Sequence, residues 1–427
     1  MTFMIIALLV LAAALGVPLF VVLGAGSLIA AHAAGLDPAV LIVEMMRLAS
    51  SPNLMAIPLF TLAGVALSRG GAPERLLAMF NAGFGWMPGG LAIVALVACA
   101  FFTAFSGASG VTILALGGLL YPILMRENYS TNFSLGLLTA SGSLGLLFPP
   151  SLAILLYGIV AGVSIEQLFV AGIVPGVVLL AMLAVYSAMV SRRIGISRRP
   201  FSLAALATAA RRGIWDLLLP LGIVVGLFGG YVTATEAATC TAAYALLLET
   251  VIHRNLRSLA HLYEIFRETV VLVGSLLIIL GVALGLTNLL IDAQIPMKIL
   301  ALMERNVNSQ LHFLLLLNLF LLVVGCLMDI FSATVVVVPL ILPLAQRFGV
   351  DPVHLGIVFL ANLEIGYLTP PVGINLFLAS QRFRAPMLSL FRAALPFLLI
   401  MLVWLALITY LPELSLWWRH MGVGGDI

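Results

Sequence analysis

Long apolar runs alternate along this chain with short stretches of charged or turn-forming residues. A helix needs about 20 apolar residues to span a bilayer, and most of the runs reach that length. The breaks predict eleven segments, near residues 3–34, 41–68, 90–125, 132–160, 166–190, 214–230, 234–250, 269–291, 311–346, 353–380 and 393–413. The pattern therefore predicts an all-α polytopic membrane protein.

Two of these runs are too long for one ordinary span. The run 90–125 holds no charged residue and is interrupted by Ser106-Gly107-Ala108-Ser109-Gly110. The run 311–346 has the same length and is interrupted at the corresponding place by Met328-Asp329-Ile330-Phe331-Ser332. Each run predicts a re-entrant helical hairpin with the interrupting string at its tip.

A second pattern repeats at an offset of 221 residues. The segments Leu144-Gly-Leu-Leu-Phe-Pro-Pro-Ser151 and Ile365-Gly-Tyr-Leu-Thr-Pro-Pro-Val372 place Gly145 opposite Gly366 and Pro149 opposite Pro370. A Gly-x-x-x-Pro-Pro string cannot continue a helix, so it predicts a broken helix within 132–160 and another within 353–380. Paired broken helices in two halves of a chain indicate the binding site of a secondary transporter.

Composition and charge agree with a membrane location and give an orientation. The chain is 63% hydrophobic and 9% charged, with a mean hydropathy of +1.21 and a net charge of +3. No basic stripe indicates nucleic acid, and membrane lipid is the expected surrounding. The three Cys residues lack metal or disulfide spacing, and no phosphate-binding loop is present. The Arg-rich stretch 191–213 is expected on the cytoplasmic side.

Threading the segments from that stretch places the base of the first hairpin inside and the base of the second outside. The two halves are therefore expected to be inverted repeats. The predicted divisions are a first repeat over 1–190, the cytoplasmic linker 191–213, a second repeat over 214–413 and a tail over 414–427. A domain that carries both hairpins is expected to slide past a scaffold made of the unbroken spans near 3–34, 41–68 and 214–250.

Each half offers a hairpin tip followed by a broken helix, with oxygen atoms as the available ligands. Hydroxyl, amide and main-chain oxygens suit a hard cation such as Na⁺. The predicted first cation site is made of Ser106, Ser109, Ser141, Gly145 and Pro149, and the predicted second site of Asp329, Ser332, Asn362, Gly366 and Thr369.

Structural explanations compete with this interpretation. Small residues at helix tips also permit tight helix packing in membranes. Asp329 is costly to bury, which favours a cation or substrate contact, but a tip that reaches water would need no partner. Glu236 and Glu364 could each cap or orient neighbouring backbone. An intramembrane enzyme that uses Asp329 or Glu236 ranks last, because no second carboxylate or His lies at a spacing that would pair with either residue on one helix face. No cofactor beyond the coupling ion is expected.

Several motifs in order resemble one family, the large membrane (M, DctM-like) subunits of tripartite ATP-independent periplasmic transporters. They are Ser106-Gly-Ala-Ser109, Leu144 to Ser151, Ser164-Ile-Glu-Gln-Leu-Phe-Val-Ala-Gly-Ile-Val-Pro-Gly176, Thr235-Glu-Ala-Ala238, Asp351-Pro-Val-His-Leu-Gly356 and Leu368-Thr-Pro-Pro-Val-Gly373. The chain departs from the family at Ala108, where a third tip Ser is usual, and at Ala234, where Pro is common.

The resemblance implies an elevator-type fold of the ion-transporter superfamily in the bacterial inner membrane. It implies Na⁺-driven uptake of an organic acid that a periplasmic substrate-binding protein (P) delivers, beside a four-helix small membrane subunit (Q). Asp329 and Ser164 fall on positions that the family associates with transport or substrate, and Ala108 could contact substrate through its backbone. No extra helices precede Met1, so we expect the small subunit to be a separate chain.

One alternative function remains. A stand-alone cation-coupled carboxylate carrier of the same superfamily would share the inverted repeat but would need neither the binding protein nor the small subunit. No local motif distinguishes dicarboxylates from sugar acids as the substrate.

Overall fold

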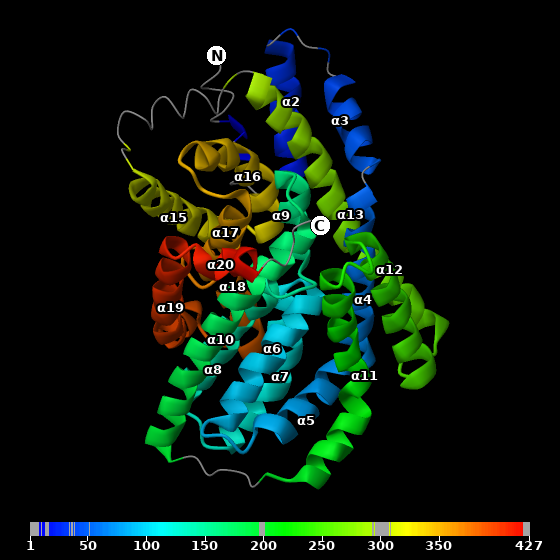
Figure 1. Cartoon of the computed structure of the whole chain (residues 1–427), viewed down its shortest axis with the longest axis vertical. Coiled ribbons are helices and arrows are strands. Elements are labelled where there is room, and N and C mark those ends of the chain that lie inside the picture. The colour runs from blue at the N-terminus through cyan, green and yellow to red at the C-terminus, as the bar shows by residue number, and fades with distance from the viewer. Residues whose placement is uncertain are drawn as a thin grey trace.

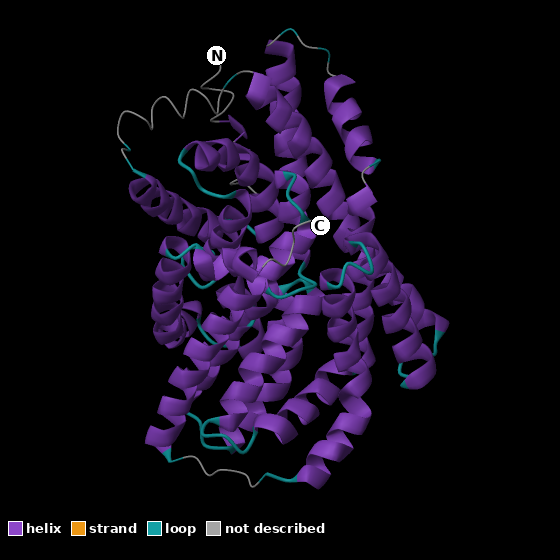
Figure 2. Ribbon diagram, in the orientation of Figure 1, coloured by secondary structure: helices purple, strands orange, loops and turns teal. Residues whose placement is uncertain are grey.

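The regular structure of the described residues is entirely helical (Figure 2). The computed structural model describes residues 17–33, 39–50, 52–195, 201–292 and 309–421, with a few single residues outside these ranges. Arg198 and Arg199 of the Arg-rich stretch lie outside the described residues, as do Lys298, Arg305 and the end of the predicted tail, 422–427.

The helices follow in this order along the chain: α2 (Leu19–Ala33), α3 (Ala39–Ala49), η1 (Pro52–Met55), α4 (Ala56–Gly70), α5 (Ala72–Phe84), α6 (Gly90–Ser106), α7 (Ser109–Arg126), α8 (Thr131–Ser141), η2 (Leu144–Leu147), α9 (Leu152–Ala161), α10 (Ile165–Ile194), α11 (Leu203–Phe228), α12 (Ala234–Leu247), η3 (Leu248–Ile252), α13 (Leu259–Asp292), α15 (Gln310–Leu327), α16 (Ile330–Arg347), α17 (Pro352–Gly366), α18 (Ile374–Phe383), α19 (Met387–Tyr410), α20 (Glu413–Leu416) and η4 (Trp417–Met421).

Six of the described helices are long and apolar enough to cross a membrane. They are α7, α10, α13 (over Leu259–Leu286), α15, α16 and α19. The pair Thr131–Leu147 and Leu152–Ala161 adds a seventh candidate that is bent by 45°. The prediction of an all-helical polytopic membrane protein is therefore confirmed.

The two long runs each divide into two helices at the expected strings. The first run breaks at Gly107 and Ala108, between α6 and α7. Gly107 has a φ of +66°, and a Cβ there would lie 2.5 Å from Cδ1 of Leu152, so both the turn and the close contact require glycine. The second run breaks at Met328 and Asp329, between α15 and α16.

The two Gly-x-x-x-Pro-Pro strings lie where helices stop. α8 ends at Ser141, and the short η2 precedes the Pro149–Pro150 pair before α9 begins. α17 ends at Gly366, and residues 367–373 lead to α18. Both Pro–Pro peptide bonds are cis. Ser151 caps α9 by accepting a hydrogen bond from the backbone N–H of Ile154.

The helices form two packed groups, and each group draws on both halves of the chain (Figure 1). α2, α3, α4, α12 and α13 pack together, with α11 lying against α12 and α5. In the other group α9 of the first broken helix packs on α16, while α18 of the second packs on α7. α4 and α13 also touch the hairpin helices α6 and α16, so the hairpins lie against the first group.

Three details differ from the expected segments. The segment 41–68 is not one unbroken span, because Pro52 cannot continue α3 and η1 separates it from α4. The linker is shorter than 191–213, since α10 runs to Ile194 and Ser202 caps a new helix from Leu203. α5 has no predicted counterpart, because it is short and amphipathic rather than apolar throughout.

Candidate functional site

The two hairpin tips meet at one cavity of about 220 Å³. Ser106, Gly107 and Ala108 line it from the first tip, and Asp329, Phe331 and Ser332 line it from the second. The opposite wall comes from α4, through Ile57 and Thr61, and from α13, through residues that include Ser275 and Leu276. Residues from both halves and from both helix groups therefore share this cavity.

The first tip presents an uncapped helix N-terminus to the cavity. Ala108 is the N-cap residue of α7, with extended backbone and no side-chain hydrogen bond to the first turn. The first N–H groups of a helix have no partners within the helix. The hydroxyl of Ser106 donates to the Ala108 carbonyl over 3.4 Å, and Ser109 is buried at the start of α7.

The second tip carries its own cap. The half-buried Asp329 accepts hydrogen bonds from the backbone N–H groups of Phe331 and Ser332, each over 3.0 Å. The hydroxyl of Ser332 also donates to the Asp329 carboxylate. The start of α16 therefore carries a negative charge at its N-cap, whereas the start of α7 offers open N–H groups.

A tyrosine that sequence reasoning did not select anchors the second tip. The hydroxyl of the buried Tyr367, in the break after α17, accepts a hydrogen bond of 2.6 Å from the backbone N–H of Ile330. The backbone N–H of Gly373 donates to the Cys326 carbonyl at 3.3 Å. These contacts join the second tip to the second broken helix.

The first tip is joined to its own broken helix in a similar way. The hydroxyl of Thr103, near the end of α6, donates to the Gly142 carbonyl over 2.8 Å and lies 2.6 Å from the Thr112 hydroxyl. A Cβ on Gly142 would lie 3.4 Å from the Ser109 carbonyl oxygen. Ser109 thus lies next to the first break.

The glycines of the repeated motif permit close helix contact. A Cβ on Gly145 would lie 2.2 Å from the Ala100 carbonyl oxygen of α6. A Cβ on Gly366 would lie 2.4 Å from the carbonyl carbon of Gly325 in α15. Each glycine therefore lets its broken helix pack on the first arm of the hairpin in the same half.

The other predicted site residues do not line the cavity. Ser141 is buried and its hydroxyl donates to Leu138, while Pro149 is buried within the first break. The Asn362 amide donates to Asn318 over 2.7 Å and to the Val358 carbonyl over 2.8 Å. The Thr369 hydroxyl donates to the Gly366 carbonyl at 2.8 Å.

Ser164 and Glu236 act as helix caps. Ser164 caps α10 by accepting a hydrogen bond from the backbone N–H of Gln167 at 3.2 Å, and it is not among the residues that line the cavity. Glu236 forms a capping box with Thr233 at the start of α12, as the structural alternative for this residue proposed.

Glu364 is the one fully buried carboxylate of the broken helices. Both of its oxygens lack a hydrogen-bond partner among the described residues, and so does the hydroxyl of Ser143, which faces it from the first break without a hydrogen bond of ordinary geometry. The two residues are separated by the same 221 positions as the repeated motifs.

The donors around the cavity are oxygen atoms of hydroxyl, carboxylate and backbone groups. No group of three or more His, Cys, Asp and Glu side chains suited to a metal ion occurs among the described residues. This donor set fits a hard cation better than a soft transition metal.

Comparison with known proteins gives the family. The sequence matches the family described as "Tripartite ATP-independent periplasmic transporter, DctM component" over residues 3–414. The C4-dicarboxylate TRAP transporter large permease protein DctM of Pseudomonas aeruginosa is 36% identical over 377 residues, which cover 88% of each chain. The ectoine TRAP transporter large permease protein TeaC of Halomonas elongata is 32% identical over 382 residues, which cover 89% of each chain.

Two further matches are a longer protein and a solved structure of low sequence identity. The isethionate TRAP transporter permease protein DctMQ of Oleidesulfovibrio alaskensis is 34% identical, and the match covers 94% of this chain and 64% of that one. The crystal structure of the YdaH transporter of Alcanivorax borkumensis superposes with a TM-score of 0.59 at 13% identity, covering 84% of this chain and 86% of that one. That likeness concerns the fold alone.

The family match extends over nearly the whole chain and includes both tips and both breaks. The chain therefore belongs to the DctM family of large permease subunits of tripartite ATP-independent periplasmic (TRAP) transporters, which are multi-pass inner-membrane transport proteins and not enzymes.

Proposed function

We propose that this chain carries a small organic acid inward across the inner membrane, coupled to Na⁺, with the cavity between the hairpin tips as the binding site. The observation that carries the proposal is the composition of the cavity wall. Both tips and two helices of the other packed group, α4 and α13, contribute to it. A ligand held there would contact both groups at once, as transport by relative motion requires.

The tips offer complementary charges for an anion and a cation. No Lys or Arg is among the described residues that line the cavity, so these residues give an anion there no cationic side chain to bind. The open N–H groups at the start of α7 and the helix dipole favour an anionic group such as a carboxylate. Ala108 would then contribute through its backbone, as the resemblance to the family implied.

Asp329 is the group that favours a cation. Its carboxylate, with the hydroxyls of Ser106 and Ser332, gives the cavity oxygen ligands suited to Na⁺. We also propose two Na⁺ sites, one at each tip. The first extends from the first tip to Ser109, Ser141, Gly145 and Pro149, and the second extends from the second tip to Asn362, Gly366 and Thr369. Binding Na⁺ would offset the charge of an anionic substrate.

The repeated architecture supports an inverted repeat that moves as an elevator. Each hairpin packs on the broken helix of its own half, and α9 and α18 each pack on the hairpin of the other half. We propose that these elements move together past α2, α3, α4, α11, α12 and α13. Two re-entrant hairpins of opposite orientation would then expose the cavity alternately on the two sides.

Two further proteins complete the proposed system. The family name specifies a tripartite transporter, so we propose a small membrane subunit (Q) beside this chain and a periplasmic substrate-binding protein (P) that delivers the solute. The relatives are named for C4-dicarboxylate, isethionate and ectoine. We therefore propose a small organic acid of this size range as the substrate.

Uptake into proteoliposomes tests the proposal. The chain is reconstituted with its small subunit and binding protein, and the solutes named for the relatives are offered under an inward Na⁺ gradient. We expect uptake only with all three components and Na⁺, and Ser106→Ala should raise the Na⁺ concentration for half-maximal uptake. Equal uptake with K⁺ or with a proton gradient alone would refute the coupling ion. Robust uptake by the chain alone would favour the stand-alone carrier.

A further inference from the structure

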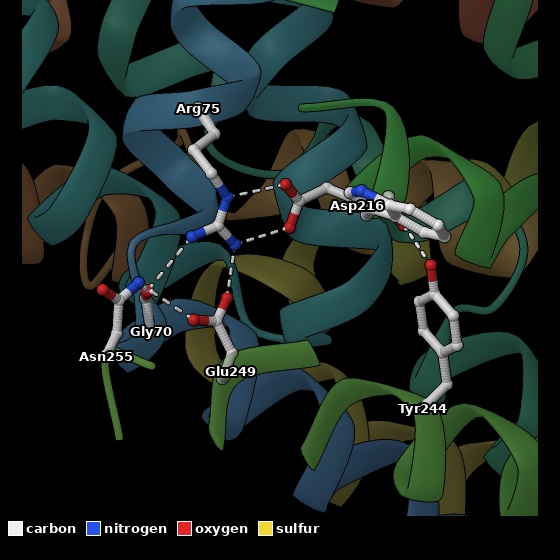
Figure 3. A network of polar contacts seen from close by, with 7 residues as sticks. Gly70, Arg75, Asp216, Tyr244, Glu249 and Asn255 are labelled. Atoms are coloured by element: carbon white, nitrogen blue, oxygen red, sulfur yellow. Dashed lines mark hydrogen bonds and ion pairs between the residues drawn. The ribbon is translucent and has the colours of Figure 1, made fainter. Parts of the chain in front are cut away.

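A network of buried charges ties α5 to α11 and η3 (Figure 3). The guanidinium of Arg75 donates to both carboxylate oxygens of Asp216, each over 2.7 Å, and also to Glu249. Asn255 donates to Glu249 at 3.1 Å. Asp216 and Glu249 are buried, so Arg75 engages both carboxylates away from water.

A cavity of about 620 Å³ lies beside this network. Thr208, Arg211, Arg212 and Trp215 line it from α11. Their spacing of three, four and seven residues puts all four on one face of the helix. Arg75 forms part of the opposite wall, together with Ile252 and His253. We call this cavity the α11 pocket.

The α11 pocket holds positive charges that the protein does not neutralise. Arg211 and Arg212 are exposed, and neither forms an ion pair with any residue that the structure describes. Asp216 and Glu249, the two carboxylates of the adjoining network, are already engaged by Arg75. Two guanidinium groups with free donors are well suited to a phosphate group.

His253 adds a neutral hydrogen-bonding group to the same pocket. Its Nε2 is buried and has no hydrogen-bond partner among the described residues. Burial and, secondarily, the charge of Arg75 lower the pKa of His253, while Asp216 opposes this effect. The imidazole is therefore neutral at pH 7 and can donate one hydrogen bond to an anion.

The position of the pocket points to a membrane lipid as the source of that phosphate. The positive-inside rule puts the Arg-rich linker, and with it the start of α11, at the cytoplasmic surface. Trp215 is a residue type that favours the membrane interface. Ile214, Leu218, Val251 and Ile252 are exposed around the pocket and would face acyl chains.

We propose that the α11 pocket binds the phosphate headgroup of an anionic phospholipid from the cytoplasmic leaflet, through Arg211, Arg212 and the ring of Trp215. Such a lipid would fix the start of α11 at the membrane surface. This inference does not depend on the substrate or on the coupling ion.

Quenching of Trp215 fluorescence by a brominated lipid measures this binding. The full-length chain is placed in phosphatidylcholine nanodiscs with increasing amounts of brominated phosphatidylglycerol, and the signal of Trp215→Phe is subtracted. The contact of Tyr244 with residue 215 uses the backbone carbonyl, so Phe preserves it. Arg211→Gln/Arg212→Gln should need roughly 30-fold more anionic lipid for half-maximal quenching, since each basic residue near the surface contributes about 1 kcal/mol.

Arg192→Gln/Arg193→Gln is the matched control, because these two exposed arginines end α10 on the same side but do not line the pocket. We expect its quenching curve to match that of the wild type. Equal loss in both double variants would show a general surface attraction and overturn the site. Relief of quenching by inorganic phosphate at concentrations comparable to the lipid would identify a soluble anion as the ligand and overturn the lipid.

Discussion

At the scale of single residues, the two hairpin tips differ at the N-cap position of the helix that follows each of them. Ala108 leaves the first turn of α7 uncapped, whereas Asp329 caps α16 with a carboxylate. A helix cap and a cation ligand make different demands on residue 329. A cap needs an acceptor oxygen, and a cation ligand benefits from the negative charge.

Asp329→Asn separates these two roles. Asn caps helices about as well as Asp, so we expect thermal stability close to that of the wild type. The Na⁺ concentration for half-maximal uptake should rise roughly tenfold or more, because a partly buried unit charge beside the cation is lost. Asp329→Ala, which also loses the cap, is the comparison that should lower stability. Unchanged Na⁺ dependence in Asp329→Asn would leave residue 329 as a cap only.

Glu364 provides a second prediction at this scale. An ionised carboxylate buried without a partner would cost several kcal/mol, so a neutral amide of the same shape should be accepted. We expect Glu364→Gln to unfold within a few degrees of the wild type and to keep Na⁺-driven uptake. Glu364→Lys should fail to fold, because it buries an unpaired charge opposite Ser143. Loss of uptake by a well-folded Glu364→Gln would show that the carboxylate itself takes part in ion binding.

Sequence reasoning identified the tip residues but not their partners. Ser106, Ala108, Asp329 and Ser332 stood out because polar and small residues interrupt apolar runs, and all four line the cavity. Tyr367 could not be identified in this way, because a tyrosine in an apolar segment is ordinary and its contact with Ile330 spans 37 positions.

At the scale of elements, the Gly-x-x-x-Pro-Pro strings predicted where the helices break, but not why the glycines are needed. Proline chemistry is local and can be read from the sequence. The close approach of Gly366 to Gly325 is a contact between separate helices and becomes evident only in three dimensions.

Gly366→Ala tests that close approach. The new Cβ would meet backbone atoms of α15, which cannot rotate away, and overpacking of this kind costs about 1–3 kcal/mol. We therefore expect lower thermal stability and reduced uptake. Gly222→Ala is the control, because a Cβ at that position of α11 meets nothing within 4 Å, and it should leave stability unchanged or raise it by up to about 1 kcal/mol. Equal effects of the two variants would contradict the packing role.

The element boundaries that the sequence mispredicted involve short or amphipathic pieces. α5 is bounded by Gly71 and Gly85 and buries only one face, so a search for apolar runs does not find it. The linker was expected to extend to residue 213 because of its arginines. The structure starts α11 at Leu203 instead, where Ser202 caps the helix and an Ala-rich stretch follows. The prediction gave this local helix signal less weight than the arginines.

At the scale of the whole molecule, the two packed groups predict relative motion. Thr61 on α4 and Ala108 at the first tip line the cavity from opposite groups. In a chain with the exposed Cys240 replaced by Ser, a reducible crosslinker between Thr61→Cys and Ala108→Cys should abolish uptake, and reduction should restore it. Single-cysteine variants treated with the same reagent show whether blocking of the cavity alone explains the loss.

Arg69→Cys/Glu264→Cys is the matched pair within one group, since these exposed side chains form an ion pair of 2.9 Å between α4 and α13. Crosslinking it should leave uptake intact. Full activity with the Thr61–Ala108 crosslink in place would mean that the hairpins do not travel, and gating around a fixed barrier would replace the elevator.

The most direct test of the central claim, that Na⁺ and the organic acid bind together between the hairpin tips, is the labelling rate of Ser275→Cys. Ser275 is exposed and lines the cavity from α13. In the reconstituted transporter, a maleimide should label this cysteine more slowly with Na⁺ and a transported solute than with K⁺ and the same solute. Equal labelling rates under the two conditions would contradict the site.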